Sequence, residues 1–399
     1  MNILVINAGS SSVKFQLLEM PSEVLICSGM VERIGEDAAI FTYKTKALEV
    51  SETIAILTHK KGLKKIVSQL LDAEKGVIKN IEEIYAVGHR VVHGGKLFTD
   101  TTLITKDVKN KINEFSTLAP LHNPHNLEGI NLAEQFFPAA KQVAVFDTAF
   151  HQTLPVKAKK YAIPNTFYSE NGIQVYGFHG TSHKYVSERA IDYLRLKKSK
   201  IISIHLGNGC SMTAILNGKS IDHSLGFAPS NGLIMGSRSG DIDHAIIFHF
   251  VHKLGYDLGT IERLLTKQSG MLGLTGYADL RDIQQEAENG NTDCILALEM
   301  NAYRIKKYIG AYTAAMNGVD AIVFTAGIGE NSSVLRKMVC YEMDFLGVVL
   351  DDTKNEQRSN SIREINDVKI SEVKILVIPT NEELEIAKQA FRLLQIIPK

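Results

Sequence analysis

The sequence predicts an α/β protein built from two duplicated domains. Short apolar segments with the period of a strand alternate with amphipathic helical segments along almost the whole chain, a pattern typical of layered α/β folds. One strand–turn–strand pattern also occurs twice, starting near residues 3 and 201. The 399 residues suffice for two or three domains, each with its own core, at about 150 residues per domain.

The expected strands are short apolar runs, and the expected helices have apolar residues three and four positions apart, most clearly in the long segment 294–316. In chain order, the strands are expected at 3–6, 13–18, 23–31, 86–88, 143–146, 201–205, 211–216, 321–325 and 374–378. The helices are expected at 53–71, 126–136, 182–194, 242–254, 294–316 and 382–394.

The internal repeat aligns ILVINAGSSSVKFQLL, which begins at Ile3, with IISIHLGNGCSMTAIL, which begins at Ile201. Strand alternation explains the apolar matches, but it does not explain why Gly9 meets Gly207 in the turn. The matched turn therefore favours duplication over coincidence. A third glycine-rich segment, AGIGENSS at 326–333, is expected to form a turn between a strand and a helix.

The charge balance argues against nucleic acid as a partner. Lysine plus arginine number 44 and aspartate plus glutamate number 44, whereas nucleic-acid-binding proteins usually carry a basic excess. The N-terminal segment lacks the basic region of a signal peptide, and no apolar run reaches the roughly 18 residues of a membrane span. The four cysteines are far apart and form no CxxC pair, which argues against a disulfide framework or a zinc site. We therefore expect a cytoplasmic protein.

The glycine-rich turns favour a phosphate site, because backbone N–H groups can converge on an anion where no side chains intervene. In NAGSSSVK, Gly9 frees the turn, Ser10 and Ser12 offer hydroxyl groups, and Lys14 adds a positive charge. The turn HLGNG at 205–209 is similar. Each turn alone could be an ordinary hairpin, but three of them favour a nucleotide site. A dinucleotide fingerprint and a P-loop are excluded, because GIGENS ends in serine and NGKS lacks the required first glycine.

Two arginines stand where an anion is expected. Arg90 follows a strand and precedes the apolar pair Val91 and Val92, and an unpaired buried guanidinium is costly, so it needs an anionic partner. The alternative is a structural ion pair. Arg238 lies in the Gly-Ser loop MGSRSGD, which suits anion binding, although a solvated loop arginine is the alternative.

Two carboxylates and a histidine complete the set. Asp147 follows a strand at the end where α/β folds place catalytic groups, with a helix cap as the alternative. Glu382 begins a helix and is either a capping-region acid or an outer ligand of Mg²⁺. His179 and His183 have a possible metal spacing, which Gly180 weakens. The combination fits phosphoryl transfer, in which the protein mainly positions groups and neutralises charge.

Nine ordered motifs carry a resemblance to a known family. They are NAGSSSVKF, VGHRVVHGG, LAPLHNP, VFDTAFH, YGFHGTSH, HLGNGCS, MGSRSGDID, FTAGIGEN and IPTNEE. In these motifs the chain resembles the acetokinase family of short-chain carboxylate kinases, from residue 2 to residue 385. The resemblance implies the fold of the sugar kinase, actin and heat-shock chaperone superfamily, with a nucleotide cleft between two domains. It implies a first domain of residues 1–148 completed by the helix 381–399, and a second, nucleotide-binding domain of residues 149–380.

The resemblance also implies an activity. The family transfers the γ-phosphoryl group of ATP to acetate, reversibly, to give acetyl phosphate and ADP, with Mg²⁺ (for which Mn²⁺ can substitute) and as a homodimer. One rival is a propionate kinase on the same scaffold, and a rival of another class is an actin-like or chaperone-like ATPase. No residues remain for the peptide-binding domain of a chaperone, and an actin-like polymer would not need Arg90 beside an apolar pair.

The resemblance assigns roles to individual residues. Arg90 matches the carboxylate-binding arginine, Asp147 the catalytic aspartate, and His179 and Arg238 the transition-state stabilisers. The magnesium positions match Asn7 and Glu382. The pocket for the acetate methyl group matches Val92, Leu121, Phe178 and Pro229. The nucleotide positions match Lys14, His205, Leu206, Gly207, Asn208, Gly209, Asp279, Leu280, Arg281, Gly327, Ile328, Gly329, Glu330 and Asn331, and the turn argument adds Ser10 and Ser12.

Three segments depart from the family pattern: FAPSNGL at 227–233, DIDH at 241–244 and GYADLRD at 276–282. The resemblance therefore implies less about nucleotide preference and loop packing than about the chemistry. Val92 bears on the choice of substrate, because a valine leaves room for a methyl group and crowds an ethyl group. We expect acetate to be preferred over propionate.

Overall fold

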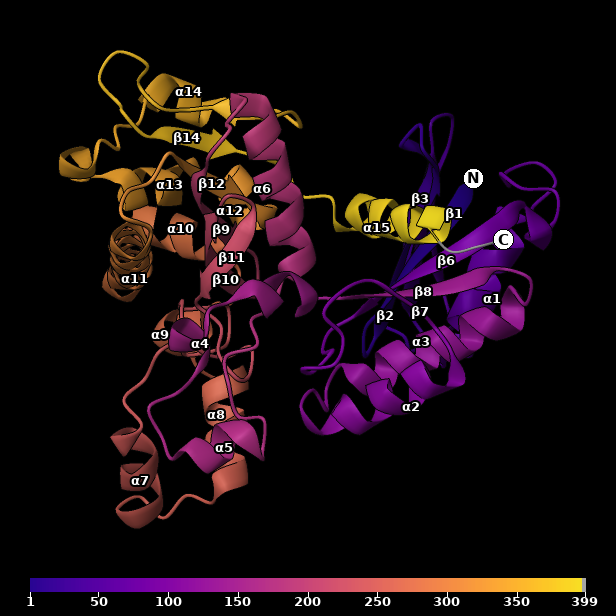
Figure 1. Cartoon of the computed structure of the whole chain (residues 1–399), viewed down its shortest axis with the longest axis horizontal. Coiled ribbons are helices and arrows are strands. Elements are labelled where there is room, and N and C mark those ends of the chain that lie inside the picture. The colour runs from indigo at the N-terminus through magenta and orange to yellow at the C-terminus, as the bar shows by residue number, and fades with distance from the viewer. Residues whose placement is uncertain (397–399) are drawn as a thin grey trace. The chain divides into compact units, whose positions relative to one another are not determined.

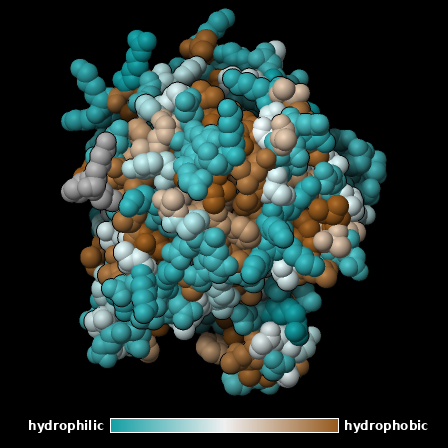
Figure 2. All heavy atoms as spheres, turned by 90° about the vertical axis from the view of Figure 1, so that its right-hand side faces the viewer, coloured by the Kyte–Doolittle hydropathy of each residue, from teal (hydrophilic) through white to brown (hydrophobic). Residues whose placement is uncertain are grey.

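The computed structural model describes residues 1–396 and divides the chain into two compact units (Figure 1). Unit 1 comprises Met1–Phe150 together with the C-terminal segment that starts at Asn381, and unit 2 comprises His151–Thr380. Each unit is a mixed α/β structure with one sheet. Within residues 1–396, no helix has both the length and the apolar character needed to cross a membrane. Hydrophilic and hydrophobic residues are mixed over the face shown in Figure 2.

Unit 1 contains eight strands in the order β5-β4-β3-β2-β1-β6-β8-β7. The strands are β1 (Asn2–Ala8), β2 (Ser12–Glu19), β3 (Val24–Glu32), β4 (Ala39–Thr45), β5 (Glu49–Ile54), β6 (Ile84–Val91), β7 (Thr102–Leu103) and β8 (Lys141–Phe146). The helices are α1 (His59–Leu70), α2 (Lys106–Glu114), α3 (Asn123–Phe136) and α15 (Glu382–Ile396), with 3₁₀ turns at Ile81–Glu83 and Phe115–Thr117.

Both faces of the unit 1 sheet are covered, so β1 is apolar on both sides. Ile3 and Val5 join the core beneath α15, which packs on β1, β6 and β8. Leu4 and Ile6 point the other way, into the core beneath α1 and α3. Figure 1 shows α15 on one side of this sheet and α1–α3 on the other. β1 is antiparallel to β2 and parallel to β6, which is parallel to β8, so the ends of β1, β6 and β8 meet at one edge.

Unit 2 contains six strands in the order β11-β10-β9-β12-β14-β13. The strands are β9 (Lys200–Leu206), β10 (Cys210–Leu216), β11 (Lys219–His223), β12 (Ala321–Thr325), β13 (Arg363–Glu364) and β14 (Lys374–Val377). The longer helices are α6 (Gly180–Leu194), α7 (Ala245–His252), α8 (Leu258–Lys267), α10 (Leu280–Glu288), α11 (Thr292–Met316) and α13 (Ser333–Cys340). The short helices are α4 (Val156–Lys159), α5 (Asn165–Ser169), α9 (Gly270–Thr275), α12 (Ala326–Asn331) and α14 (Asp352–Glu356), with 3₁₀ turns at Ala149–Thr153 and Asp344–Leu346.

The two sheets share a topology, which confirms the duplication. β9 is antiparallel to β10 and parallel to β12, as β1 is antiparallel to β2 and parallel to β6. In each unit the aligned glycine is the first residue of the turn, and its N–H closes the turn: Gly9 N donates to Ser12 O at 2.8 Å, and Gly207 N donates to Gly209 O at 3.2 Å. The turn of unit 2 is one residue shorter than that of unit 1. NGKS is the tight β10–β11 hairpin, with Asn217 and Gly218 both at positive φ.

Several expected elements need correction. The helix expected at 53–71 begins only at His59, because β5 continues to Ile54 and the Thr58 hydroxyl accepts from Lys61 N as the helix cap. The segment 326–333 is not an open turn: α12 starts directly where β12 ends, and Ser332 caps α13. The helix expected at 242–254 is the shorter α7, and β4 and β5 were not expected at all.

Candidate active site

The edge of the unit 1 sheet brings Arg90, Asp147 and Glu382 together. Arg90 lies near the end of β6, Asp147 follows β8, and Glu382 begins α15. Arg90 donates from Nε to Asp147 Oδ1 at 3.0 Å and from Nη2 to Asp147 Oδ2 at 2.6 Å, a two-pronged pair. The side chain of Asp147 is only 1% exposed, and Glu382 Oε2 lies 3.8 Å from Arg90 Nε. The ion pair considered for Arg90 is therefore present.

The charged side chains in this group shift one another's pKa values. Burial alone would lower the pKa of Arg90, but the neighbouring Asp147 and Glu382 outweigh burial and hold that pKa above its ordinary value. Burial raises the pKa of Glu382, Arg90 opposes this rise, and Asp147 adds to it. Lys14 pairs with Glu383 at 2.8 Å, from Nζ to Oε1. Three carboxylates therefore meet two cationic side chains, and this excess of negative charge suits one further cation.

Close packing places α15 at this edge. A Cβ on Gly88 of β6 would lie 2.8 Å from Ile386 Cγ2, so the helix can approach the strand only because Gly88 has no side chain. Asn381 Oδ1 accepts from Leu384 N at 3.0 Å and caps the helix. The first turn of α15 consequently presents Glu382 and Glu383 to the strand ends.

The turn after β1 is held from α3. Asn126 donates from Nδ2 to Ala8 O at 2.8 Å and accepts from Val92 N at 3.0 Å, so one buried amide joins the ends of β1 and β6. Asn7 lies directly opposite Lys14 in the β1–β2 ladder. Val92 is buried, whereas the side chain of Leu121 is 59% exposed. Ser10 is exposed and Ser12 is half-buried.

In unit 2, a relay of histidines and serines supports His179. His179 precedes α6 in the left-handed conformation, with φ 55°. Its Nδ1 lies 2.8 Å from Ser211 Oγ, and the same hydroxyl lies 2.7 Å from His183 Nε2. His183 Nδ1 lies 2.8 Å from Ser203 Oγ. The two histidines whose spacing could suit a metal, His179 and His183, therefore both contact the Ser211 hydroxyl group.

Arg238 and His179 flank the second glycine turn. A Cβ on Gly209 would lie 3.5 Å from the His179 ring and 3.7 Å from Arg238 Nη1. Arg238 also donates from Nη1 to Pro229 O at 2.7 Å. Burial lowers the pKa of Arg238 from its ordinary value. A glycine turn edged by an imidazole and a guanidinium is a suitable binding place for phosphoryl oxygens. Phe178 is buried beside this group.

Further residues of unit 2 that the resemblance predicts to bind the nucleotide lie around the same turn. His205 Nδ1 is 2.8 Å from Ser182 Oγ, and the His205 ring stacks on His179 with 4.4 Å between centroids. Gly207 approaches α12, since a Cβ there would lie 4.0 Å from Ala326 Cβ. Gly236 packs against the Asn208 side chain, since a Cβ on Gly236 would lie 2.1 Å from Asn208 Oδ1. Leu206 is buried at the end of β9.

Two of the segments that depart from the family pattern, 276–282 and 241–244, are held by hydrogen bonds of an aspartate side chain. Asp279 caps α10, and its carboxylate pairs with Arg281, which lowers the pKa of Asp279 to about 2. Asp241 accepts from Gly232 N at 2.7 Å and from the Tyr308 hydroxyl at 2.7 Å. Leu280 is buried under α10. The loop 241–244 is thereby anchored at its first residue.

Three buried histidines of unit 2 predict acid lability. Burial lowers the pKa of His151 to about 4, and it lowers the pKa of His183 and His223 well below their ordinary value of 6.5. The folded state keeps them neutral while the unfolded state takes up protons, so stability is complete above about pH 6.5 and falls as the pH is lowered. We expect the free energy of unfolding to fall, below about pH 6.5, by on the order of 1 kcal/mol per pH unit for each histidine that is protonated only in the unfolded state.

Calorimetry at several pH values measures this loss. His244→Gln is the matched control, because that histidine is exposed and should leave the slope unchanged. A melting temperature of unit 2 that stays constant over this pH window would contradict the prediction.

Comparison with known proteins decides the family. The model of the Acetokinase family matches residues 2–388. The chain belongs to the acetokinase family. It is 62% identical to the acetate kinase of Flavobacterium johnsoniae over 395 residues, which cover 99% of this chain and all of that protein. The crystal structure of Porphyromonas gingivalis acetate kinase matches with a TM-score of 0.92 at 44% identity, covering 98% of this chain and 99% of that one. A Francisella tularensis propionate kinase matches with a TM-score of 0.91 at 42% identity, covering 97% and 98%.

Sequence reasoning missed four supporting residues of this acetokinase. Glu383 holds Lys14, Asn126 holds the first turn, and Ser211 links His179 to His183. The fourth, Arg336, is fully buried and donates from Nη1 to Gly329 O at 2.8 Å and to Glu330 O at 3.0 Å. Glu383, next to Glu382, and Ser211, at the end of the motif HLGNGCS, lie in segments that the sequence singled out, but their partners do not follow from the motifs. Asn126 and Arg336 bond to backbone groups, which no motif in a single sequence reveals.

Proposed function

We propose that this acetokinase transfers the γ-phosphoryl group of ATP to acetate, reversibly, to give acetyl phosphate and ADP. The observation that carries the proposal is the state of Arg90 beside the buried Val92. Asp147 engages Nε and Nη2, and within residues 1–396 Nη1 makes no ion pair or hydrogen bond. That nitrogen is free to bind a carboxylate, and Val92 offers an apolar surface for a methyl group. A guanidinium next to an apolar wall suits a short carboxylic acid.

In this mechanism the first unit binds and orients the acceptor. Acetate is already an anion at neutral pH, so its oxygen attacks the γ-phosphorus without a general base. Arg90 holds the acetate carboxylate and reduces its repulsion from the phosphate charge. Asp147, buried and paired with two nitrogens of Arg90, orients the guanidinium rather than accepting a proton.

The second unit neutralises charge on the transferred group. Arg238 and His179, at the Gly209 turn, bind the equatorial phosphoryl oxygens as charge redistributes in the transition state. The glycine turn 205–209, with α12 and Asp279–Arg281, holds the nucleotide, and on this proposal unit 2 is the nucleotide-binding domain. In unit 1, the turn after β1 together with Lys14 is a further phosphate-binding segment.

The oxygen donors of unit 1 suit Mg²⁺. Glu382 and Asn7 offer a carboxylate and an amide oxygen, and the excess of carboxylates over cationic side chains around Glu382 fits a bound cation. Glu382 and Asn7 would hold the ion, directly or through water, and Mn²⁺ could replace it. When bound, Mg²⁺ supplies charge that screens the phosphate oxygens.

The same residues predict the effect of losing one metal ligand. Glu382→Gln and Asn7→Ala should each raise the Mg²⁺ concentration for half-maximal activity by about tenfold and leave the fold intact, because Mg²⁺ keeps several waters and few protein ligands. Magnesium titrations of activity measure the effect, and Glu19→Gln, an exposed glutamate on β2, is the control. Unchanged titrations in both variants would remove these residues from the metal site.

The Val92 side chain predicts which carboxylic acid is the better substrate. Acetate should exceed propionate in kcat/KM by about ten- to two-hundredfold, since one methylene group is worth about 1–3 kcal/mol in an apolar pocket. Val92→Ala should narrow or reverse the ratio, chiefly through the KM for propionate. An unchanged ratio in a folded variant would exclude Val92 from the pocket.

The overall reaction is tested with hydroxylamine, which traps acyl phosphates as coloured hydroxamates. Acetate with ATP should give hydroxamate together with ADP, whereas an actin-like or chaperone-like ATPase would release ADP without it. The second candidate is a propionate kinase, favoured by the 42% identical Francisella tularensis structure of that name. A wild-type preference for propionate in the same assay would establish that alternative.

We further propose a cytoplasmic homodimer. ATP as a substrate and four cysteines that are free and buried support the compartment. Exposed apolar side chains of unit 2, among them Phe248, Leu258 and Tyr303, support self-association. Light scattering of the purified chain should give twice the 44.1 kDa mass of one chain.

A further inference from the structure

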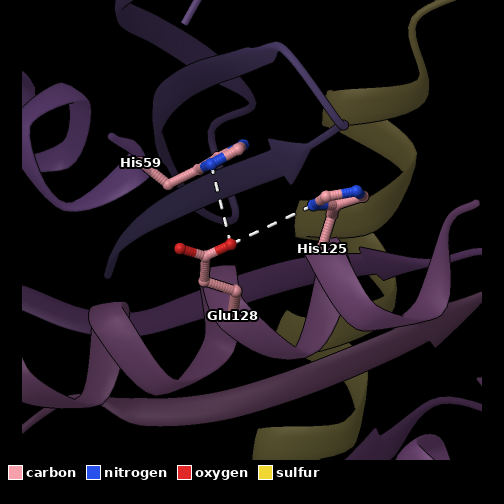
Figure 3. A group of neighbouring side chains, drawn as sticks. All are labelled: His59, His125 and Glu128. Carbon is pink, nitrogen blue, oxygen red and sulfur yellow. Dashed lines mark ion pairs between the residues drawn. The ribbon is translucent and has the colours of Figure 1, made fainter. Parts of the chain in front are cut away.

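Two histidines and a glutamate form a separate group in unit 1 (Figure 3). His59 is the first residue of α1, and His125 and Glu128 lie one turn apart on α3. One ligand-type atom of each residue lies within 4.8 Å of the other two. Figure 3 shows the Glu128 carboxylate pointing toward both rings. His59 Nδ1 lies 3.6 Å and His125 Nδ1 lies 4.0 Å from the same oxygen, Oε2. None of the three belongs to the residues that the mechanism uses.

The other nitrogen of His59 determines which atom can bind a cation. His59 Nε2 lies 2.8 Å from the carbonyl oxygen of Gly9. Since a carbonyl oxygen can only accept, Nε2 carries the hydrogen, and the neutral ring has its lone pair on Nδ1. That lone pair faces the carboxylate of Glu128, which is also an acceptor. Two facing acceptors repel each other unless a cation lies between them, either a proton on Nδ1 or a metal ion.

We propose that His59, His125 and Glu128 bind a divalent transition-metal ion of the zinc type. Two imidazoles and a carboxylate are ligands that Zn²⁺ takes, whereas Mg²⁺ prefers oxygen alone. The hydrogen bond from His59 Nε2 to Gly9 O is the outer contact that a metal-binding histidine usually makes, because it fixes the tautomer and the ring orientation. A solvent molecule would complete the four ligands.

The distances are compatible with such a site. With metal–ligand bonds of about 2.0–2.2 Å, tetrahedral donor atoms lie about 3.3–3.6 Å apart. His59 Nδ1 and Glu128 Oε2 are already 3.6 Å apart. On binding, the 4.0 Å between His125 Nδ1 and Glu128 Oε2 must shorten by about 0.5 Å, and the separation of the two histidine nitrogens, which is within 4.8 Å, by up to about 1.5 Å. The side chains that would move are His125, which is 34% exposed, and Glu128, which is 46% exposed, whereas His59 is buried and fixed by Gly9.

Metal binding here would connect three segments. The ion would join the start of α1 to α3, and His59 would extend that connection to the carbonyl of Gly9, in the turn proposed to bind phosphate. A bound ion would therefore restrain the first glycine turn through His59, at a place separate from Asn7 and Glu382. The binding claim does not depend on the proposed function, because it concerns the ion alone.

Cobalt is the probe, since Co²⁺ enters zinc sites and absorbs visible light when histidine binds it. The full chain without an affinity tag is titrated with Co²⁺ in excess Mg²⁺, which occupies oxygen sites. We expect visible bands that saturate near one equivalent and disappear on addition of Zn²⁺. His125→Ala and Glu128→Gln, at a half-buried and an exposed position of α3, should each weaken binding by about tenfold or more and keep the wild-type circular dichroism spectrum. His244→Ala is the control, since it removes an exposed histidine that also lies near a carboxylate, Asp243.

The outcomes separate the alternatives. Loss of the cobalt bands in both α3 variants and their retention in His244→Ala would establish the site. Equal binding by wild type and both variants would place the metal elsewhere and overturn the proposal. Absence of cobalt and zinc binding in the wild-type chain would also overturn it.

Discussion

Replacement of Arg90 by alanine is expected to lower kcat/KM for acetate by about 10²–10⁴-fold, the range for one lost charge-stabilising donor. Much of the loss should appear as a higher KM for acetate, because Arg90 is proposed to bind the carboxylate in the ground state as well as the transition state. The variant should also be less stable. Asp147 would keep a buried charge without its two-pronged partner, and breaking such a pair costs about 3–5 kcal/mol where both groups are buried.

Arg90→Lys distinguishes the two effects. Lysine keeps the charge near Asp147 and should recover much of the stability, but its single ammonium group lacks the fork that holds Asp147 and acetate at once. Steady-state kinetics and thermal unfolding of both variants give the comparison. If folded Arg90→Ala kept wild-type turnover and acetate KM, Arg90 would be only the structural ion pair that the sequence also allowed.

Strands and helices in which apolar residues recur with a regular period could be predicted from the sequence, and those without such a pattern could not. β1, β9, β10 and β12 are buried on both faces, and β2 is buried on one face. The apolar residues of these five strands marked them within a residue or two at each end. None of the six residues of β5 is buried, so burial imposes no apolar pattern that would mark this strand in the sequence. α12 was mistaken for a turn because its two glycines, Gly327 and Gly329, usually weaken a helix, and its place depends on close packing against β9.

The residues of the candidate site likewise divide into those that could be predicted from the sequence and those that could not. Motifs identified Arg90, Asp147 and Arg238 because each charged residue stands beside a buried strand or in a glycine loop. The partner of Lys14 could not be predicted, since Glu383 follows it by more than three hundred residues and reaches it only when α15 packs over Gly88. The role of Ser211 likewise depends on the distance between α6 and β10, which the sequence does not specify.

Arg238→Ala is expected to lower kcat and kcat/KM for acetate together, by about 10²–10⁴-fold, and to change the acetate KM little. The guanidinium lies beside Gly209 and His179, where it is proposed to meet charge that develops on the phosphoryl group, so its contribution should appear mainly in the transition state. This split differs from that of Arg90→Ala, in which the acetate KM should rise.

Stability should respond less than for Arg90, because Arg238 donates to the neutral carbonyl of Pro229 and leaves no buried carboxylate behind. Arg263→Ala on α8 is the matched control, since it removes an exposed arginine from the same unit. Turnover numbers, KM values for acetate and ATP, and circular dichroism of both variants make the measurement. A folded Arg238→Ala enzyme with normal kcat would show that this arginine only braces its own loop, and the charge on the phosphoryl group would then fall to His179 and the backbone N–H groups of the glycine turn.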